Sequence, residues 1–265
     1  MKLYLSVDME GITGAQAWSQ TELGGQGYAE LRQRMALETA TVAAAALKAG
    51  AQEIWVQDAH DTGRNLEPGE LPEGCRLLRG WSGDPRLMVQ ELDSTFDGLL
   101  LVGWHAAAGS GASPLCHSMS TRLTGLRLNG ESCSELRLAA LSAAGMGVPL
   151  LFCAGDAATV AEAALLAPGL GRVCTQEGRG DAVLCQDAAG VLRQLEEECA
   201  RALRAPRRVR LPKLPRRWEL ELDYREGSAA RRASFYPGME QVSPLTLRLK
   251  GANLEELLRA LLFVA

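Results

Sequence analysis

The sequence predicts an α/β protein built around a mainly parallel β-sheet with flanking helices (βαβ units), followed by a smaller C-terminal α+β portion. The first indication is a strand, a helix and a second strand in close succession, at residues 2–7, 28–48 and 53–57. A strand–helix–strand unit of this length places its two strands parallel in one sheet. The second indication is a pair of apolar runs at residues 96–102 and 148–153, typical of strands buried on both faces.

The opening strand at residues 2–7 runs directly into Asp8 and Glu10, and glycines follow at Gly11 and Gly14. Side chains two positions apart in an extended segment point the same way, so these two carboxylates are expected to converge. In open α/β sheets, ligands bind at the carboxyl ends of the strands. The alternative is that both are ordinary polar residues ending a strand.

A glycine-rich loop leads from this strand to the long helix expected at residues 28–48, with Gly50 as its stop. Its apolar residues recur at helical spacing. The remaining expected strands are residues 75–78, 122–128, 173–176, 182–185, 218–224 and 243–249, and the remaining expected helices are residues 85–92, 132–144, 157–166, 188–203 and 253–264.

A proline- and arginine-rich stretch at residues 205–217 is the best candidate for a domain boundary. We therefore expect an α/β metal-binding catalytic domain at residues 1–205. Residues 206–265 are expected to form a small α+β portion packed on it.

Composition excludes several classes of protein. The chain is 47% hydrophobic, has a formal net charge of −4 and contains 5% aromatic residues, with no basic stripe interleaved with aromatic side chains. These features indicate a folded protein and argue against nucleic acid as a partner. No apolar run approaches the roughly 18–20 residues that cross a membrane, so no membrane association is expected.

The seven cysteines are odd in number, scattered, and contain no CxxC pair. This usage is typical of a reduced, cytoplasmic protein rather than a disulfide-stapled one. Acidic residues at positions 8 and 10 argue against a signal peptide. We therefore expect a cytoplasmic location.

The three histidines of the chain fall in one window, each directly after an expected strand or in the loop that it opens. His60 and His105 follow strands, and His117 lies further along the loop after His105. A parallel sheet would bring His60 and His105 to the same edge as Asp8 and Glu10. Each histidine taken alone could instead be a hydrogen-bonded structural residue.

Carboxylates together with imidazoles suit a hydrolytic metal site, because Zn²⁺ accepts both kinds of ligand. Mn²⁺ or Co²⁺ could use similar ligands. Two metals would need a further donor and a shared carboxylate. Glu135 could be that donor, although Ser132-x-x-Glu135 also matches a helix capping box.

Three further side chains could each have one of two roles. Asp58, two residues before His60, either orients a ligand histidine or simply ends its strand. Cys116 and Cys133, close to His117 and Glu135, could be soft metal ligands, although buried packing is the favoured explanation.

Six motifs occur in order along the chain: VDMEGITG at residues 7–14, DAH at 58–60, GWHA at 103–106, HSM at 117–119, NGESCSE at 129–135 and FYPGME at 235–240. This set resembles the bacterial zinc-dependent D-aminopeptidases, the DppA-like family of binuclear metallopeptidases. The resemblance covers essentially the whole chain.

The resemblance implies two Zn²⁺ ions per subunit, with Asp8, Glu10, His60, His105 and Glu135 as ligands and Asp8 as the bridge. It implies hydrolysis of short peptides that begin with a D-amino acid, by metal-activated water with His117 as the catalytic residue. It also implies a ring-like homo-oligomer, such as a decamer. It favours Glu135 as a ligand over its reading as a helix cap.

Two alternatives remain on the sequence alone. The same metals could serve another hydrolase, such as an amidase or a phosphatase. Alternatively, the chain could be a non-catalytic, metal-stabilised binding protein. A nucleotide-binding loop and a serine-hydrolase elbow are both poorly supported, because the chain lacks GxGxxG, a P-loop lysine and GxSxG.

Overall fold

The predicted α/β class is confirmed by a computed structural model, which describes residues 1–204 and 209–265. A seven-stranded sheet has the order β3-β2-β1-β4-β7-β8-β9. Every neighbouring pair in it is parallel except β8 and β9, which are antiparallel. Its strands are β1 (Lys2–Val7), β2 (Glu53–Asp58), β3 (Cys75–Leu78), β4 (Gly98–Trp104), β7 (Leu150–Asp156), β8 (Gly171–Arg179) and β9 (Ala182–Cys185).

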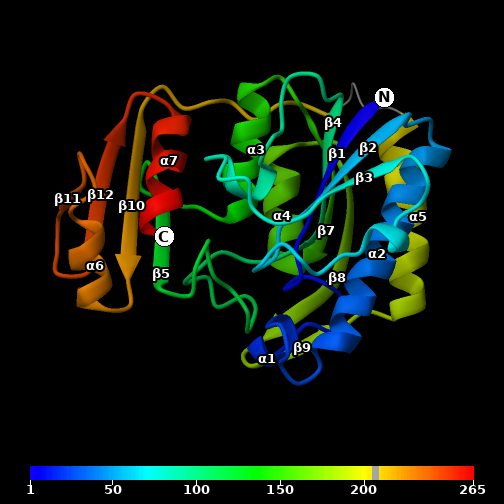
Figure 1. The fold of residues 1–265 in the computed structure, drawn as a ribbon, viewed down its shortest axis with the longest axis horizontal. Coiled ribbons are helices and arrows are strands. Elements are labelled where there is room, and N and C mark those ends of the chain that lie inside the picture. The colour runs from blue at the N-terminus through cyan, green and yellow to red at the C-terminus, as the bar shows by residue number, and fades with distance from the viewer. Residues whose placement is uncertain (205–208) are drawn as a thin grey trace.

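Helices cover both faces of this sheet (Figure 1). On one side α2 (Tyr28–Lys48) packs against α5 (Ala188–Arg204). On the other side lie α3 (Glu135–Gly145) and α4 (Ala157–Leu166), between the large sheet and a second, smaller one. The sheet strands β4 and β7 are buried along their whole length, as expected for a sheet sandwiched between helices.

The second sheet is antiparallel and has the order β11-β12-β10-β5-β6. Its strands are β5 (Leu123–Leu128), β6 (Glu131–Ser132), β10 (Trp218–Tyr224), β11 (Glu240–Gln241) and β12 (Thr246–Gly251), with helices α6 (Gly227–Ala233) and α7 (Leu254–Val264) beside them. Two of its strands therefore come from the middle of the chain. The division at residue 205 stays a prediction, and residues 205–208 lie outside the described residues.

Helix α3 joins the two layers. Leu136 and Ala140 belong to the core under the large sheet. Leu138 and Leu141, from the same helix, belong to the core under the small sheet. Because α3 begins at Glu135, this double burial fixes that carboxylate between the two layers.

Some expected elements are shorter or shifted. The helix expected at residues 85–92 is only the 3₁₀ turn η2 (Leu87–Val89), and a second such turn, η1 (Pro68–Glu70), lies before β3. The helix expected from residue 132 begins at Glu135. The short helices α1 (Trp18–Thr21) and α6 were not expected, because elements of four to seven residues show too little periodicity. No helix within the described ranges has the length and apolar character that crossing a membrane requires.

Candidate metal centre

Four of the predicted ligands lie at one edge of the large sheet, directly after three adjacent strands. Strand β1 lies between β2 and β4, and Val7 is in register with both Asp58 and Val102. Asp8 and Glu10 follow β1, His60 follows β2, and His105 follows β4, and all four side chains are buried. The parallel arrangement that was expected from the sequence thus brings these four residues together.

Two glycines permit this close approach. A Cβ atom on Gly11 would lie 1.9 Å from the carbonyl oxygen of Trp104, and one on Gly103 would lie 2.1 Å from the carbonyl oxygen of Asp8. Gly103 also has φ +75°, in the left-handed region that favours glycine. The loops after β1 and β4 can therefore touch backbone to backbone.

Asp8 lies at the middle of the cluster. One of its oxygens, Oδ1, is 3.2 Å from Nδ1 of His60, and the other, Oδ2, is 3.3 Å from Nε2 of His105. His60 Nδ1 is also 3.0 Å from Oε2 of Glu10. A carboxylate that faces two imidazoles with separate oxygens is suited to bridge two cations.

Glu135 closes the other side of the cluster. Its Oε1 lies 3.6 Å from Nε2 of His105 and 3.7 Å from Nε2 of His117. The rings of His105 and His117 stack with their centroids 4.2 Å apart. Donor atoms of Asp8, Glu10 and His105 lie within 4.8 Å of one another, as do those of His105, His117 and Glu135. These two groups share His105.

Backbone carbonyls fix the orientation of all three imidazoles. Nε2 of His60 donates to the carbonyl oxygen of Thr21 at 2.7 Å, and Nδ1 of His105 donates to that of Ala106 at 3.0 Å. Nδ1 of His117 donates to the carbonyl oxygen of Leu115 at 3.0 Å. A carbonyl oxygen carries no proton, so each imidazole must donate there and presents its other nitrogen to the carboxylates. Metal-binding histidines are commonly oriented in this way.

The carboxylates of the cluster favour positive charge on the groups around them. Burial opposes ionisation of Asp8, but its contacts with His105 and His60 hold the pKa of its carboxyl well below the usual range. Burial would lower the pKa of His60 and His105, yet the surrounding carboxylates raise the pKa of both well above the usual value. Burial raises the pKa of Glu135.

Buried polar atoms in the cluster also lack partners. Oδ2 of Asp8, Oε2 of Glu10 and Nε2 of His105 make no hydrogen bond with the described residues. His60 Nδ1 lies close to Glu10 Oε2 but without the alignment that a hydrogen bond needs. Unpartnered buried groups are costly unless something else satisfies them. Because nitrogen and carboxylate oxygen are the ligands that zinc prefers, this donor set fits zinc.

Glu135 is not part of a capping box with Ser132. Instead Ser134 caps helix α3, accepting from the backbone N–H of Arg137, and Glu135 is the first helical residue. Its Oε1 accepts from the backbone N–H of Met119 at 2.7 Å. Met119 has φ +65°, which is uncommon for a residue with a side chain and turns that N–H toward Glu135.

Asp58 organises the loop after β2 rather than the imidazole of His60. Its carboxylate accepts from the backbone N–H of Leu66 at 2.7 Å and from the side-chain amide of Asn65 at 2.9 Å. Its contact with His60 is to the backbone N–H. The hypothesis that Asp58 orients this ring directly is therefore wrong.

Sequence reasoning missed two supporting contacts. Trp18, in α1, packs edge-on against His117 with ring centroids 5.2 Å apart. The carboxylate of Asp156 accepts from Ala106, in the loop after β4, and caps α4 through Thr159. An aspartate after an apolar strand and before a helix was the available signal for the second contact.

The two cysteines near the cluster are free thiols. Cys133 is fully buried in the core under the small sheet, and burial raises the pKa of its thiol. Its Sγ lies 3.6 Å from the carbonyl oxygen of Ser134. These surroundings fit packing rather than metal binding.

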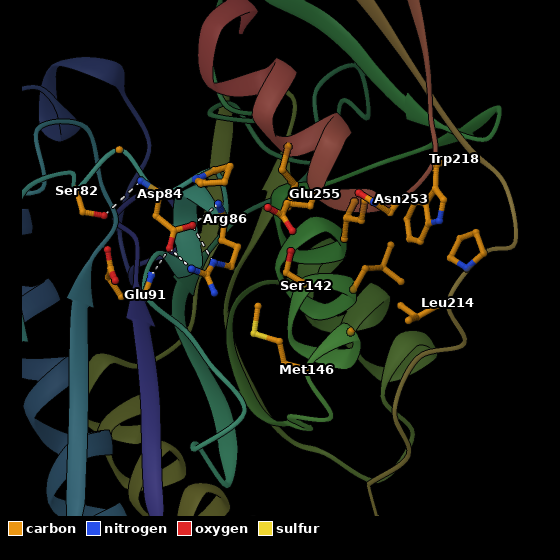
Figure 2. A pocket seen from close by; sticks show the side chains of 17 residues that line it. Ser82, Asp84, Arg86, Glu91, Ser142, Met146, Leu214, Trp218, Asn253 and Glu255 are labelled. Atoms are coloured by element: carbon orange, nitrogen blue, oxygen red, sulfur yellow. Dashed lines mark hydrogen bonds and ion pairs between the residues drawn. The ribbon is translucent and has the colours of Figure 1, made fainter.

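A cavity of about 400 Å³ opens onto the cluster. The cluster contributes Asp8, Glu10, His60, His117 and Glu135 to its wall, and the rest of the lining includes Trp18, Trp81, Met119 and Arg122. A larger cavity, of about 880 Å³, lies elsewhere (Figure 2). Its lining contains the ion pair of Asp84 with Arg86 but no histidine and none of the predicted site residues. The smaller cavity is therefore the candidate active site.

Comparison with known proteins bears directly on this centre. The sequence profile of the D-aminopeptidase family, peptidase family M55, matches residues 1–263. The chain belongs to this family. The predicted family and the predicted class of enzyme, a D-aminopeptidase, are thereby confirmed.

A known sequence and a solved structure, both of Bacillus subtilis D-aminopeptidase, are similar to this chain. A D-aminopeptidase of Bacillus subtilis (strain 168) is 33% identical over 266 residues, which cover 99% of this chain and 96% of the relative. A solved structure described as the Zn-dependent D-aminopeptidase DppA from Bacillus subtilis, a self-compartmentalizing protease, matches with a TM-score of 0.93 and 32% identity. That match covers 100% of this chain and 96% of the other.

Proposed function

We propose that this member of the family is a zinc-dependent aminopeptidase that hydrolyses short peptides with a D-amino acid at the amino end. The observation that carries this proposal is the cluster of three carboxylates and three imidazoles. In this cluster Oδ2 of Asp8, Oε2 of Glu10 and Nε2 of His105 are buried and have no hydrogen-bond partner among the described residues. The specificity for D-residues is supported by the similar sequence and the similar solved structure, which are both described as D-aminopeptidases.

Asp8, Glu10, His60, His105 and Glu135 would hold two zinc ions per chain. Asp8 is the proposed bridge, because its two oxygens face His60 and His105 separately. The zinc dependence of the solved relative supports the choice of metal. When bound, zinc would polarise the scissile carbonyl group and lower the pKa of a water molecule.

His117 is the proposed proton-transfer residue. It is the most exposed of the three imidazoles, with 15% of its side chain accessible, and it lines the cavity. Its Nδ1 donates a hydrogen bond to the carbonyl oxygen of Leu115, which leaves Nε2 facing Oε1 of Glu135. An imidazole with one nitrogen fixed by a hydrogen bond can carry a proton on its other nitrogen to the leaving amine.

Glu135 and Trp18 would position His117 for this transfer. Glu135 faces Nε2, and Trp18 packs against the ring. The stacked ring of His105 covers one face of His117. These contacts restrict the orientation of the imidazole.

We further propose that the chain works in the cytoplasm as a closed homo-oligomer, such as a ring-like decamer, that encloses its active sites. The description of the solved relative as self-compartmentalizing supports assembly. Sedimentation of the purified protein at several concentrations tests it, and a monomeric mass throughout would refute it.

Hydrolysis of matched peptides tests the proposed function. D-Ala-D-Ala should be cleaved and L-Ala-L-Ala cleaved far more slowly. Chelation should abolish cleavage, and added Zn²⁺ should restore it. Cleavage that persists after the metal has been stripped would contradict the proposal. A parallel panel of phosphoesters and N-acyl amides distinguishes a peptidase from another binuclear hydrolase.

A further inference from the structure

A second cavity adjoins the candidate active site. Its volume is about 600 Å³, and it shares Trp18, Glu22, Thr121 and Arg122 with the cavity that contains His117 and Glu135. Its wall also contains Arg225 and Arg232. Arg122 therefore stands where the two cavities meet, with the proposed metal ligands on one side and two further arginines on the other.

None of these three arginines forms an ion pair with an Asp or Glu side chain within residues 1–204 and 209–265, and Arg122 contacts the main-chain oxygen of Ala265. Every neighbouring arginine on the small sheet behaves differently: Arg127 pairs with Glu221 and Asp223, and Arg248 pairs with Glu221. The carboxylates that line the second cavity are Glu22 and Glu226. Three guanidinium groups that outnumber the carboxylate side chains of the cavity wall, and that pair with none of them, make the cavity suited to an anionic ligand.

Arg122 is held in place at the start of β5. Its backbone carbonyl accepts from the N–H of Arg225 at 2.8 Å, and its Nε donates to Oγ of Ser120 at 3.2 Å. Its Nη2 donates to the main-chain oxygen of Ala265, the last residue of the sequence, which also lines the active-site cavity. Nη1 donates to none of the described residues and is free to bind a ligand.

We propose that Arg122 binds the carboxylate at the far end of a short peptide substrate, with Arg225 and Arg232 extending the same cationic subsite into the adjoining cavity. This inference rests on the proposed function. A peptide whose amino end lies at the metal ligands carries its only obligatory negative charge at the opposite end. Arginine is the residue best shaped to bind a carboxylate through two hydrogen bonds.

Arg122 and the proposed metal ligands line one small cavity, which suits short peptides. Each extended residue adds about 3.3–3.6 Å, and the active-site cavity is at the small end of the usual range of ligand sites, roughly 300–1,000 Å³. Because Arg122 lines the same cavity as the proposed ligands, we assign it to the carboxylate of a dipeptide. A longer peptide would place its carboxylate toward Arg225 and Arg232. The subsite therefore favours short peptides over long ones, because the carboxylate of a long peptide would lie beyond the three arginines.

A pair of substrates that differ only in this charge tests the inference: D-Ala-D-Ala and its C-terminal amide, D-Ala-D-Ala-NH₂. The wild type should prefer the acid. Arg122→Gln should raise KM for the acid by about 10- to 100-fold and leave kcat and the kinetics of the amide nearly unchanged, because uniform binding energy is lost. Arg122→Lys should restore part of the preference. Arg231→Gln is the matched control, because Arg231 lies beside Arg232 in α6 but packs over Phe235 and lines neither cavity.

The outcomes separate this inference from the proposed function. If the wild type cleaves neither substrate, the proposed function fails. If the wild type cleaves both equally well, or if Arg122→Gln lowers both rates by the same factor, the enzyme is a peptidase but Arg122 does not bind the carboxylate. A retained preference for the acid in Arg122→Gln would overturn the inference in the same way.

Discussion

The carbonyl oxygen of Thr21 accepts a hydrogen bond from Nε2 of His60 at 2.7 Å. This contact fixes which nitrogen of His60 carries the proton and turns Nδ1 toward Asp8 and Glu10. Thr21 belongs to α1, a helix of only four residues. The strands of the sheet therefore place His60 at the site, and the short helix α1, outside the sheet, fixes the orientation of its ring.

Asp8 should matter more to metal binding than any other carboxylate in the cavity. We expect Asp8→Asn to lose most of the bound zinc, because Asp8 alone faces both His60 and His105. Elemental analysis after purification without chelators measures this. Asp61→Asn is the control, since Asp61 lines the same cavity without facing either ring. Equal zinc content in wild type and Asp8→Asn would rule out the bridging role.

Bound zinc should stabilise the fold, because the ligands are brought together only in the folded chain. Zinc in 100-fold excess over its dissociation constant contributes about 2.7 kcal/mol for one site. For a chain of this size we expect a rise in Tm of several degrees over the metal-free protein. Calorimetric scans with and without Zn²⁺ report the shift, and a Tm independent of zinc would count against a metal centre.

Gly103→Ala should damage both the fold and the site. A Cβ atom there would meet the backbone oxygen of Asp8 at 2.1 Å, and the φ of +75° is strained for alanine. We expect a loss of about 3 kcal/mol or more in the free energy of unfolding. Gly145→Ala at the end of α3 is the control, because a Cβ there meets nothing within 4 Å. If urea denaturation gave equal stabilities for the two variants, the proposed close contact would be wrong.

The buried Glu38 should make stability depend on pH. Burial raises the pKa of its carboxyl from 4.5 to about 7, while contacts with Thr13 lower it in part. The folded state therefore binds more protons than the unfolded state between these values. Stability should fall by up to about 3 kcal/mol as pH rises from about 4.5 to 7 and change little from this source above that.

Glu38→Gln should remove this component, since glutamine stays neutral. The difference in the free energy of unfolding between wild type and variant isolates it from the titration of the metal ligands. Unfolding by urea at several pH values in metal-free buffer measures the difference. A difference that does not vary between pH 4.5 and 7 would contradict the assignment.

The large sheet could be predicted because its strands are buried on both faces. Such strands appear in a sequence as continuous apolar runs, and polar residues directly after them mark the edge where ligands gather. Residues 2–7 and 96–102 show this pattern, which is why Asp8, Glu10, His60 and His105 could be placed together. Their individual roles as ligands remain predictions.

The small sheet and the supporting contacts could not be predicted in the same way. Strand β5 pairs with β10 across more than ninety residues of sequence, and no local pattern encodes that pairing. Ser132 and Ser134 are equally plausible helix caps from composition, and only the register of α3 selects Ser134. The contacts of Thr21 and Ala106 with the imidazoles involve backbone oxygens, which every residue carries.

The most direct test is zinc content measured together with cleavage of D-Ala-D-Ala, for the wild type and His117→Ala. The account predicts about two zinc ions per chain in both proteins, with cleavage only in the wild type. Loss of one zinc in His117→Ala would contradict this prediction and make His117 a ligand together with His105 and Glu135. Wild-type protein without bound metal, or His117→Ala with full activity, would contradict the account.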